Sequence, residues 1–416
     1  MKNIWHNKSF VFYLIGQTIS SLGDGFYLIG FMWLAFQLSN GKGIVLGGVF
    51  SIYTLSEIVF GFLAGPVVDR VNKKVLLITI DIIRGVIVMI LYVLVRFNSI
   101  HIAHVYFFTF IFSVFSPFFH RAEFAVIPQL VDSPFLLNVN GILAGSKKLM
   151  QVIAPALGGL FIGFFGMASC FLFDAISFFL SVICIMLIAI RTTASLKKNI
   201  NIKSFMIDIK EGYRFLINSS FLLTLALYAA CINFFGAPIF PLLVLISQKA
   251  NVGSSGYGAM MSGMSVGFII SSFIIVIIGK FLKKIPIVML GLLISSSGII
   301  LMALGNGSVP LVIASVLLGL GINLSNLPIV TLFQENVPQE KIGVVSSFVF
   351  TIAQVAMPIS MMLSGLLVDL FSLTGIFIGI STILIVGAVI GFFLPTLRNE
   401  CVYVSGGVPS TANDLQ

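Results

Sequence analysis

Residues 65–74 read GPVVDRVNKK and separate two long apolar segments, at 44–66 and 75–96. Each segment reaches the roughly 20 apolar residues that a helix needs to cross a bilayer. Only 9% of the 416 residues are charged and 58% are hydrophobic, whereas a soluble domain carries about 25% charged residues. So few charges cannot cover a surface that faces water. The composition therefore predicts an integral membrane protein.

The same criterion of length and composition predicts twelve spans along the chain. The first apolar run continues from Phe10 past Phe31, which is too long for the apolar core of a signal peptide and predicts a first span. Only Gly166 and its neighbours divide the fifth span from the sixth, which predicts a tight hairpin. The predicted spans are 11–36, 44–66, 75–96, 102–128, 140–165, 167–190, 219–246, 256–279, 285–305, 309–333, 343–368 and 373–394.

The basic residues support this count and predict an orientation. With a cytoplasmic N-terminus, eighteen of the 23 Lys and Arg fall at the cytoplasmic side, Lys147 and Lys148 among them. Lys42, Arg96 and Lys249 are the three on the outer side. Cytoplasmic loops are enriched in Lys and Arg, so this bias predicts that both termini are cytoplasmic. Topology then accounts for the net charge of +9, and no nucleic-acid partner is expected.

A weak internal repeat divides the spans into two sets of six. When the chain is shifted by about half its length, LGGL at 157–160 aligns with LSGL at 363–366. Two six-helix halves are the plan of transporters that rock about a central site. The expected parts are an N-terminal six-helix bundle over 1–190, a cytoplasmic linker with an amphipathic helix over 191–218, a C-terminal six-helix bundle over 219–396 and a disordered cytoplasmic tail over 397–416.

The decapeptide at 65–74 resembles the loop signature of the major facilitator superfamily, G-x-x-x-D-[RK]-x-G-[RK]-[RK]. Only Asn72 departs from it, standing where the signature has glycine. Asparagine also tolerates the left-handed backbone that such a turn needs. In span five, Gly145 followed by APALGG at 154–159 is similar to the antiporter signature of the superfamily's exporters, with Ala154 in place of one glycine.

Three further segments resemble the macrolide-efflux-type branch of that superfamily. They are FDAISF at 173–178, LFQE at 332–335, and AMPI at 356–359 followed by LSG at 363–365. The resemblance implies an all-α membrane protein with twelve transmembrane helices in two pseudo-symmetric six-helix bundles, the major facilitator fold. It also implies a bacterial inner or plasma membrane location, with the lipid bilayer as a partner and a monomer as the functional form.

The implied function is secondary active export of a lipophilic or amphipathic small molecule, such as a macrolide-like drug or a siderophore. Proton antiport with alternating access would drive this export, and the export of a drug would confer antibiotic resistance. A proton-coupled lipid or metabolite permease and a transporter-like ligand sensor are the alternatives. An intramembrane enzyme is a weaker hypothesis. LGDG at 22–25 lacks the first glycine of the G-x-G-D motif of aspartyl intramembrane proteases, and the sequence has no HExxH motif. A channel, a cofactor, a metal site and ATP drive are not expected.

Seven acidic and basic residues within the predicted spans are candidates for function, and all seven lie in the first half of the chain. Each costs roughly 2.5–3.5 kcal/mol to insert at the bilayer centre and is therefore a functional candidate. Asp24 near the midplane of span one and Glu57 at a similar depth in span two are expected to couple protons, unless Asp24 only bonds a neighbouring helix. By position in span four, Arg121 resembles an arginine of the superfamily that is implicated in proton transfer, and Glu123 completes this set. The seven are Asp24, Glu57, Asp81, Arg84, Arg121, Glu123 and Asp174.

The resemblance also implies a cytoplasmic gate at the loop after span two. Asp69 would cap the N-terminus of span eleven and hold the cytoplasmic side shut, while the loop cations anchor the loop or serve topology alone. Asp81 and Arg84 are spaced to pair on one face of span three. The expected gate residues are Gly65, Asp69, Arg70, Lys73, Lys74, Asp81 and Arg84.

A hinge and a substrate cavity complete the expected sites. The antiporter-type residues of span five would bend the helix and let a neighbour approach, although ordinary close packing explains them equally well. Aromatic and amide side chains of spans one and seven would line the cavity. The hinge residues are Gly145, Pro155, Gly158 and Gly159, and the cavity residues are Tyr27, Phe31, Trp33, Asn233, Phe234 and Phe235.

Overall fold

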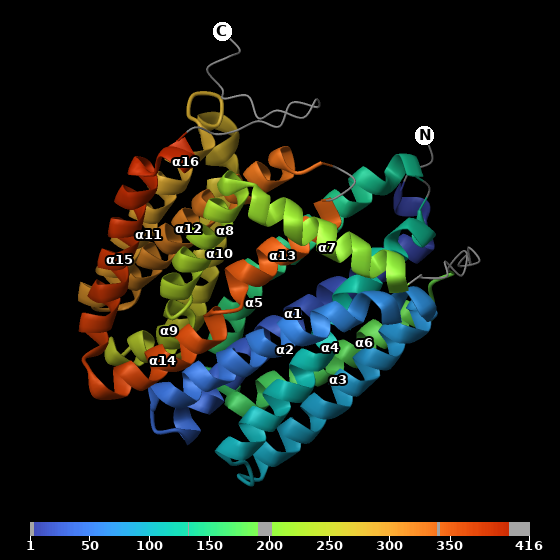
Figure 1. Ribbon diagram of the computed structural model, residues 1–416. Helices are drawn as coiled ribbons and strands as arrows, with labels where there is room; N and C mark the ends of the chain where they lie inside the picture. Colours follow the sequence, from blue (N-terminus) through green and yellow to red (C-terminus); the bar gives the residue numbers. More distant parts are fainter. Residues whose placement is uncertain (1–3, 132, 190–201, 339–341, 399–416) are drawn as a thin grey trace. The chain divides into compact units, whose positions relative to one another are not determined.

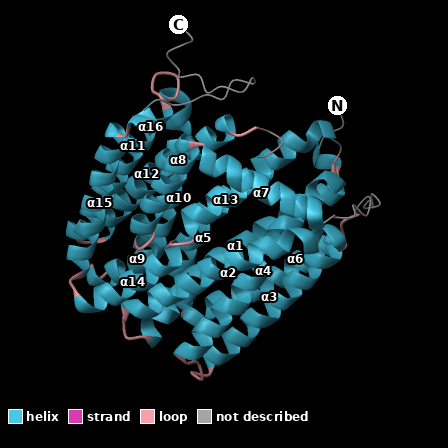
Figure 2. Cartoon of the chain, viewed as in Figure 1, coloured by secondary structure: helices cyan, strands magenta, loops and turns pink. Residues whose placement is uncertain are grey.

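The computed structural model describes residues 4–131, 133–189, 202–338 and 342–398. Within these ranges the chain consists of helices joined by short loops and contains no strand (Figure 2). Twelve segments of the described chain are long and apolar enough to cross a membrane, which confirms the predicted number of spans. Figure 1 labels these helices, and the chain divides into two compact units with sequence boundaries at residues 197/198, 240/241 and 265/266.

The first unit comprises residues 1–197 and 241–265. In it α1 packs against α5 and α6, α3 packs against α6, and α2 packs against α4. Gly166, with φ of 78°, separates α5 from α6 and confirms the predicted tight hairpin. Its helices are η1 (Ile4–His6), α1 (Lys8–Leu38), α2 (Gly43–Arg70), α3 (Lys73–Arg96), α4 (Ile102–Leu130), η2 (Ser133–Phe135), α5 (Leu136–Phe165), α6 (Met167–Met186), most of α9 (Ile239–Lys249) and the first half of α10 (Gly253–Ile278).

The second unit comprises residues 198–240 and 266–416. Its central pair is α11 and α12, which approach so closely that a Cβ on Gly291 would lie 2.7 Å from the Gly321 carbonyl oxygen. Small residues allow such contacts between helices in lipid. Its helices are α7 (Ile202–Asn218), α8 (Ser220–Gly236), the second half of α10, α11 (Lys284–Leu304), α12 (Ser308–Asn336), α13 (Ile342–Gln354), α14 (Met357–Leu370), α15 (Leu373–Phe393) and α16 (Pro395–Arg398).

Spans seven and eleven are each broken into two helices, α8 with α9 and α13 with α14, where continuous spans were expected. Pro238 has no N–H, so the carbonyl of Phe234 loses its helical donor. The Ser360 hydroxyl donates to that carbonyl instead. In return, the side-chain amide of Asn233 donates to the carbonyl of Ala353 at 3.0 Å. The two breaks therefore satisfy each other's backbone, as lipid requires.

Parts of the expected linker and tail lie outside the described residues. Residues 190–201, with the basic start of the linker, are among them, and so are residues 399–416 of the tail. Within the expected linker, α7 is a helix that packs against α13. The first residues of the expected tail, Leu397 and Arg398, belong to α16 rather than to an irregular segment.

Candidate functional site

Asp24 lies near the middle of α1 and its side chain is exposed. On either side of it, Gly23 faces Asp174 and Ser177 of α6, and Gly25 faces Ala154 of α5. Asp24 thus points away from α5 and α6, the two helices that make the most contacts with α1. Within the described part of the chain its carboxylate has no hydrogen-bond partner, so the expected alternative of a bond to a neighbouring helix does not form.

Two other carboxylates of the first unit are fully buried against serines of α6. Ser181 donates to Asp81 at 2.8 Å, and Ser177 donates to Asp174 at 3.3 Å. One oxygen of each carboxylate has no partner among the described residues. Asp174 was an interior candidate in the sequence without a role assigned to it. It lies against Gly23, the residue that precedes Asp24 in α1.

Arg84 is buried, with only 4% of its surface exposed. Its guanidinium lies over two rings of α4, 5.1 Å from the centroid of Phe112 and 4.8 Å from that of Phe119. Cation–π contacts of this kind gain strength when the cation is desolvated. No ion pair with Asp81 forms in the part of the chain described. Instead of the pair suggested by the i,i+3 spacing, Arg84 contacts the two aromatic rings, and Asp81 accepts a hydrogen bond from Ser181.

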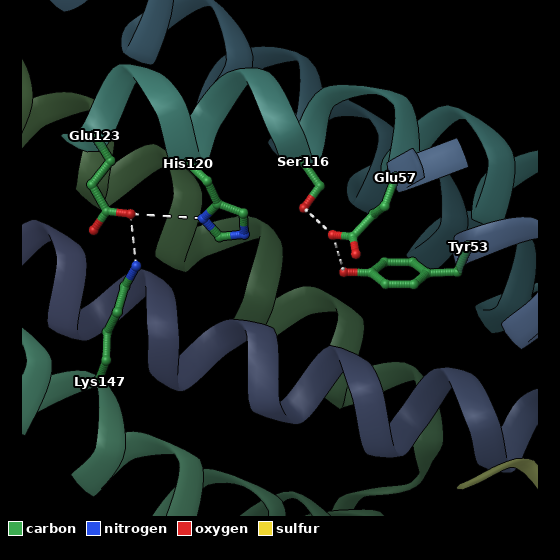
Figure 3. A network of polar contacts seen from close by, with 6 residues as sticks. All are labelled: Tyr53, Glu57, Ser116, His120, Glu123 and Lys147. Atoms are coloured by element: carbon green, nitrogen blue, oxygen red, sulfur yellow. Dashed lines mark hydrogen bonds and ion pairs between the residues drawn. The ribbon is translucent and has the colours of Figure 1, made fainter. Parts of the chain in front are cut away.

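One face of α4 connects two polar clusters (Figure 3). Ser116, His120 and Glu123 are spaced by four and three residues, so they lie on the same side of the helix. Toward one end, Glu57 of α2 accepts hydrogen bonds from Tyr53 at 3.0 Å and from Ser116 at 3.3 Å. Glu57 therefore has partners on its own helix and on α4, and it does not contact Asp24 directly.

Toward the other end of this face, Glu123 forms an ion pair with Lys147 of α5 (Figure 3). The Lys147 ammonium donates to Glu123 Oε2 at 2.6 Å, and His120 Nδ1 lies 3.7 Å from the same oxygen. The Glu123 side chain is 10% exposed. Sequence reasoning missed both partners: Lys147 was counted only as a topological cation, and His120 was not considered. The spacing of 116, 120 and 123 was the available signal.

Arg121 lies apart from these clusters, although it was expected to join them. Its side chain is exposed, and its guanidinium lies 3.5 Å from the position that a Cβ on Gly65 would occupy. The structure therefore places Arg121 beside the start of the 65–74 loop motif and not beside Glu57 or Glu123.

The loop cations have separate roles within the first unit. Lys74 donates to the carbonyls of Met186 at 2.8 Å and Ile188 at 2.6 Å, at the C-terminus of α6, where the helix dipole favours a cation. Lys73 donates to the Val71 carbonyl at 3.1 Å, and Arg70 is exposed. The side chain of Asp69 lies outside the described part. Asp81 and Arg84, buried inside the unit, are not in contact with these loop cations.

Asn72 is the N-cap of α3, and it does not adopt the left-handed backbone that was expected. Its φ of −67° is ordinary, and its side chain accepts from the backbone N–H groups of Lys74 at 3.0 Å and Val75 at 3.3 Å. Asparagine thus satisfies two N–H groups at the helix start.

Changes at Asn72 are expected to follow the order of N-cap preference. Asn72→Ala should lower the free energy of unfolding by about 1 kcal/mol, whereas Asn72→Gly, which restores the loop signature, should cost only a few tenths. The thermal unfolding of both purified variants in detergent measures the difference. An equal loss of stability in the two variants would contradict a capping role for the Asn72 side chain.

The antiporter-type residues of α5 form two close helix crossings. A Cβ on Gly158 would lie 3.2 Å from the Phe26 Cα of α1, and a Cβ on Gly159 would lie 2.5 Å from the Ser254 carbonyl oxygen of α10. Pro155 is buried inside α5, where it removes one helical N–H. Gly145 has nothing within 4 Å of an added Cβ. The motif therefore combines two packing glycines with one that is free of contacts.

The second unit contains a cavity of about 500 Å³. Asn233 lines it, together with residues of both broken spans, such as Gly236 and Gln354. Phe234 and Phe235, expected in a cavity, stack edge to face on each other and are not among its lining residues.

The expected cavity residues of span one lie in the first unit. Tyr27 stacks on Phe112 with 4.7 Å between centroids and on Phe31 with 5.0 Å. Trp33 is buried, and its ring lies 5.4 Å from that of Phe36. These rings pack within the helices of their own unit.

Comparison with known proteins gives a family and several distant relatives. The model of the Major Facilitator Superfamily matches residues 13–361 and 239–401. Macrolide efflux protein A of Streptococcus pyogenes is 23% identical over 394 residues, covering 93% of this chain and 96% of that protein. The Multidrug efflux pump Tap of Mycolicibacterium fortuitum is 20% identical, covering 92% of this chain and 95% of that protein.

Solved structures agree on the fold. A bacterial homologue of the iron transporter ferroportin, in its inward-facing state, has a TM-score of 0.71 at 14% identity and covers 96% of this chain and 99% of that chain. At this identity the likeness shows the fold alone. The family model extends over most of the chain, and the twelve spans agree with it. This multi-pass membrane protein, a transporter and not an enzyme, therefore belongs to the major facilitator superfamily.

Proposed function

We propose that the protein is a proton-coupled exporter of an amphipathic small molecule that works by alternating access. The observation that carries the proposal is Asp24, an exposed carboxylate in the middle of a span, without a hydrogen-bond partner among the described residues. A carboxylate in lipid is costly, so such a residue faces an aqueous path and is available to protons. The distant relatives named for macrolide and multidrug efflux support the direction and the substrate class.

The polar face of α4 supplies a route by which protons would move between Asp24 and the other carboxylates. His120 stands between the Glu57 and Glu123 clusters (Figure 3). Histidine exchanges protons readily near neutral pH. In this proposal Asp24 loads the proton, and the Glu123–Lys147 pair opens or closes as that charge changes.

Asp24→Asn tests the coupling in proteoliposomes with an imposed pH gradient. We expect gradient-driven flux of a radiolabelled macrolide to fall to the rate measured without a gradient, because asparagine cannot carry the proton. Exchange of labelled for unlabelled macrolide at equal pH should persist, since that exchange needs no net proton movement. Glu211→Gln on α7, which removes an exposed carboxylate outside the spans, is the matched control and should leave both rates unchanged.

Three outcomes would contradict the proposal. If flux through the wild-type protein did not depend on the pH gradient, transport would not be coupled to protons, and the protein would be a uniporter or would use a different driving ion. Full gradient-driven flux in Asp24→Asn would show that a residue other than Asp24 couples transport to protons. Binding without any flux would favour a ligand sensor.

A further inference from the structure

The cavity of the second unit is mainly apolar and carries no charged side chain. Its lining residues, all within the described chain, include no Asp, Glu, Lys, Arg or His. The apolar part of the lining is formed by residues such as Ile322, Phe333 and Phe350. The interior charges of the spans, by contrast, belong to the first unit. A charged ligand buried in this cavity would lose its hydration and find no counter-ion there.

Several hydrogen-bonding groups of the cavity are unused. Ser295 is 3% exposed, and its hydroxyl has no partner in the described part of the chain. The side-chain amides of Asn326, Gln334 and Gln354 also line the cavity, and no hydrogen bond is made to them by any described residue. A buried hydroxyl without a partner is uncommon, because an unsatisfied polar group costs about 1–3 kcal/mol. The Ser295 hydroxyl, however, has almost no accessible surface and faces Gly321 of α12, so the three amides are the groups available to a ligand.

We propose that this cavity binds the uncharged part of the transported molecule, an apolar ring or chain that carries hydroxyl and carbonyl groups. Amides both donate and accept hydrogen bonds, so the three amides together match carbonyl and hydroxyl groups on a ligand. The volume of about 500 Å³ falls in the range of roughly 300–1,000 Å³ that is usual for sites of small molecules. The inference rests on the proposed export function and specifies its substrate.

The broken spans explain why such a site forms here. Asn233, Gly236 and Ala237 of span seven and Ala353, Gln354 and Met357 of span eleven surround the two breaks, and all of them line the cavity. Asn233 is already bonded to the Ala353 carbonyl, so it holds the wall together. Gln354, at the end of α13, is left to face the ligand.

Gln354→Leu is the sharpest test, because it removes a cavity amide that makes no hydrogen bond to any described residue. We expect unchanged thermal stability without ligand and a rise of about three- to tenfold in Kd, the loss of one neutral hydrogen bond. The probe is erythronolide B, an uncharged macrolactone polyol, titrated calorimetrically against the full chain in lipid nanodiscs at one pH. Gln129→Leu is the matched control, because Gln129 lies on α4 of the first unit and does not line the cavity.

A second pair of measurements tests the charge preference. Erythromycin, which adds an amino sugar to a similar ring, should bind within about threefold of erythronolide B, because the cavity offers nothing to the amine. Asn326→Asp should weaken erythronolide B by placing a bare carboxylate in the cavity, and should weaken erythromycin less.

Two results would overturn the inference: binding of erythromycin but not of erythronolide B, or an affinity for erythronolide B that neither Gln354→Leu nor Asn326→Asp changes. Because no pH gradient is applied, these binding results do not depend on proton coupling. Normal binding with gradient-independent flux would contradict the proposed function alone, and coupled flux with no effect of the cavity variants would contradict the inference alone.

Discussion

Gly159→Ala is expected to abolish transport, whereas Gly145→Ala in the same α5 motif is expected to leave it unchanged. The Cβ added at Gly159 would lie 2.5 Å from the Ser254 carbonyl oxygen, 3.1 Å from the Ser255 Cα and 3.2 Å from the Gly258 Cα. All three are backbone atoms, so none can rotate out of the way. The α5 and α10 backbones would have to separate, and Ser254 would lose its 3.2 Å hydrogen bond to the Gly159 carbonyl.

The size of this effect follows from the cost of overpacking, typically 1–3 kcal/mol and more where the backbone must move. Gly145 has open space around it, so an added methyl group meets nothing. Gradient-driven flux and thermal stability of both variants, measured at matched expression, provide the comparison. A functional Gly159→Ala variant would show that this crossing opens during transport and that the contact belongs to one conformation only.

The spans could be predicted from the sequence because length and apolar composition decide them. The breaks in spans seven and eleven could not. Pro238 and Pro358 are visible in the sequence, but proline is tolerated in transmembrane helices wherever a neighbour satisfies the freed backbone. Whether the Ser360 hydroxyl reaches the Phe234 carbonyl depends on the packing of two segments more than 100 residues apart.

The sequence identifies single residues of the candidate site, but it does not predict which residues form hydrogen bonds or ion pairs with them. The sequence places Asp24 near the middle of a span, but that its carboxylate is exposed depends on how α5 and α6 pack against α1. That Glu123 pairs with Lys147 depends on how α4 and α5 lie together, and the positive-inside rule assigned this lysine to the membrane edge. Asn72 shows a local failure: a family signature suggested a left-handed turn, whereas the residue type itself is a good N-cap.

Breaking the Glu123–Lys147 pair one residue at a time is expected to destabilise the protein, and removing both charges is expected to restore it. Glu123→Gln leaves the Lys147 ammonium beside a neutral amide inside a span, and Lys147→Gln leaves the carboxylate of Glu123, which is only 10% exposed, with His120 alone. Loss of one partner of a fully buried ion pair lowers the free energy of unfolding by about 3–5 kcal/mol. Because the Lys147 side chain is partly exposed, we expect a smaller loss of about 2 kcal/mol for each single change. Thermal unfolding in one detergent and lipid mixture measures all three variants.

The double variant Glu123→Gln/Lys147→Gln separates a structural pair from a working one. If the pair only holds α4 against α5, the double variant should regain both stability and gradient-driven flux, because two amides still bond to each other. If the pair opens when Asp24 takes up a proton, as proposed, stability should return while gradient-driven flux stays low and equal-pH exchange continues. A single variant as stable as wild type would contradict the ion pair itself. Recovery of coupled flux in the double variant would restrict proton coupling to Asp24 and to the Glu57 end of the α4 face.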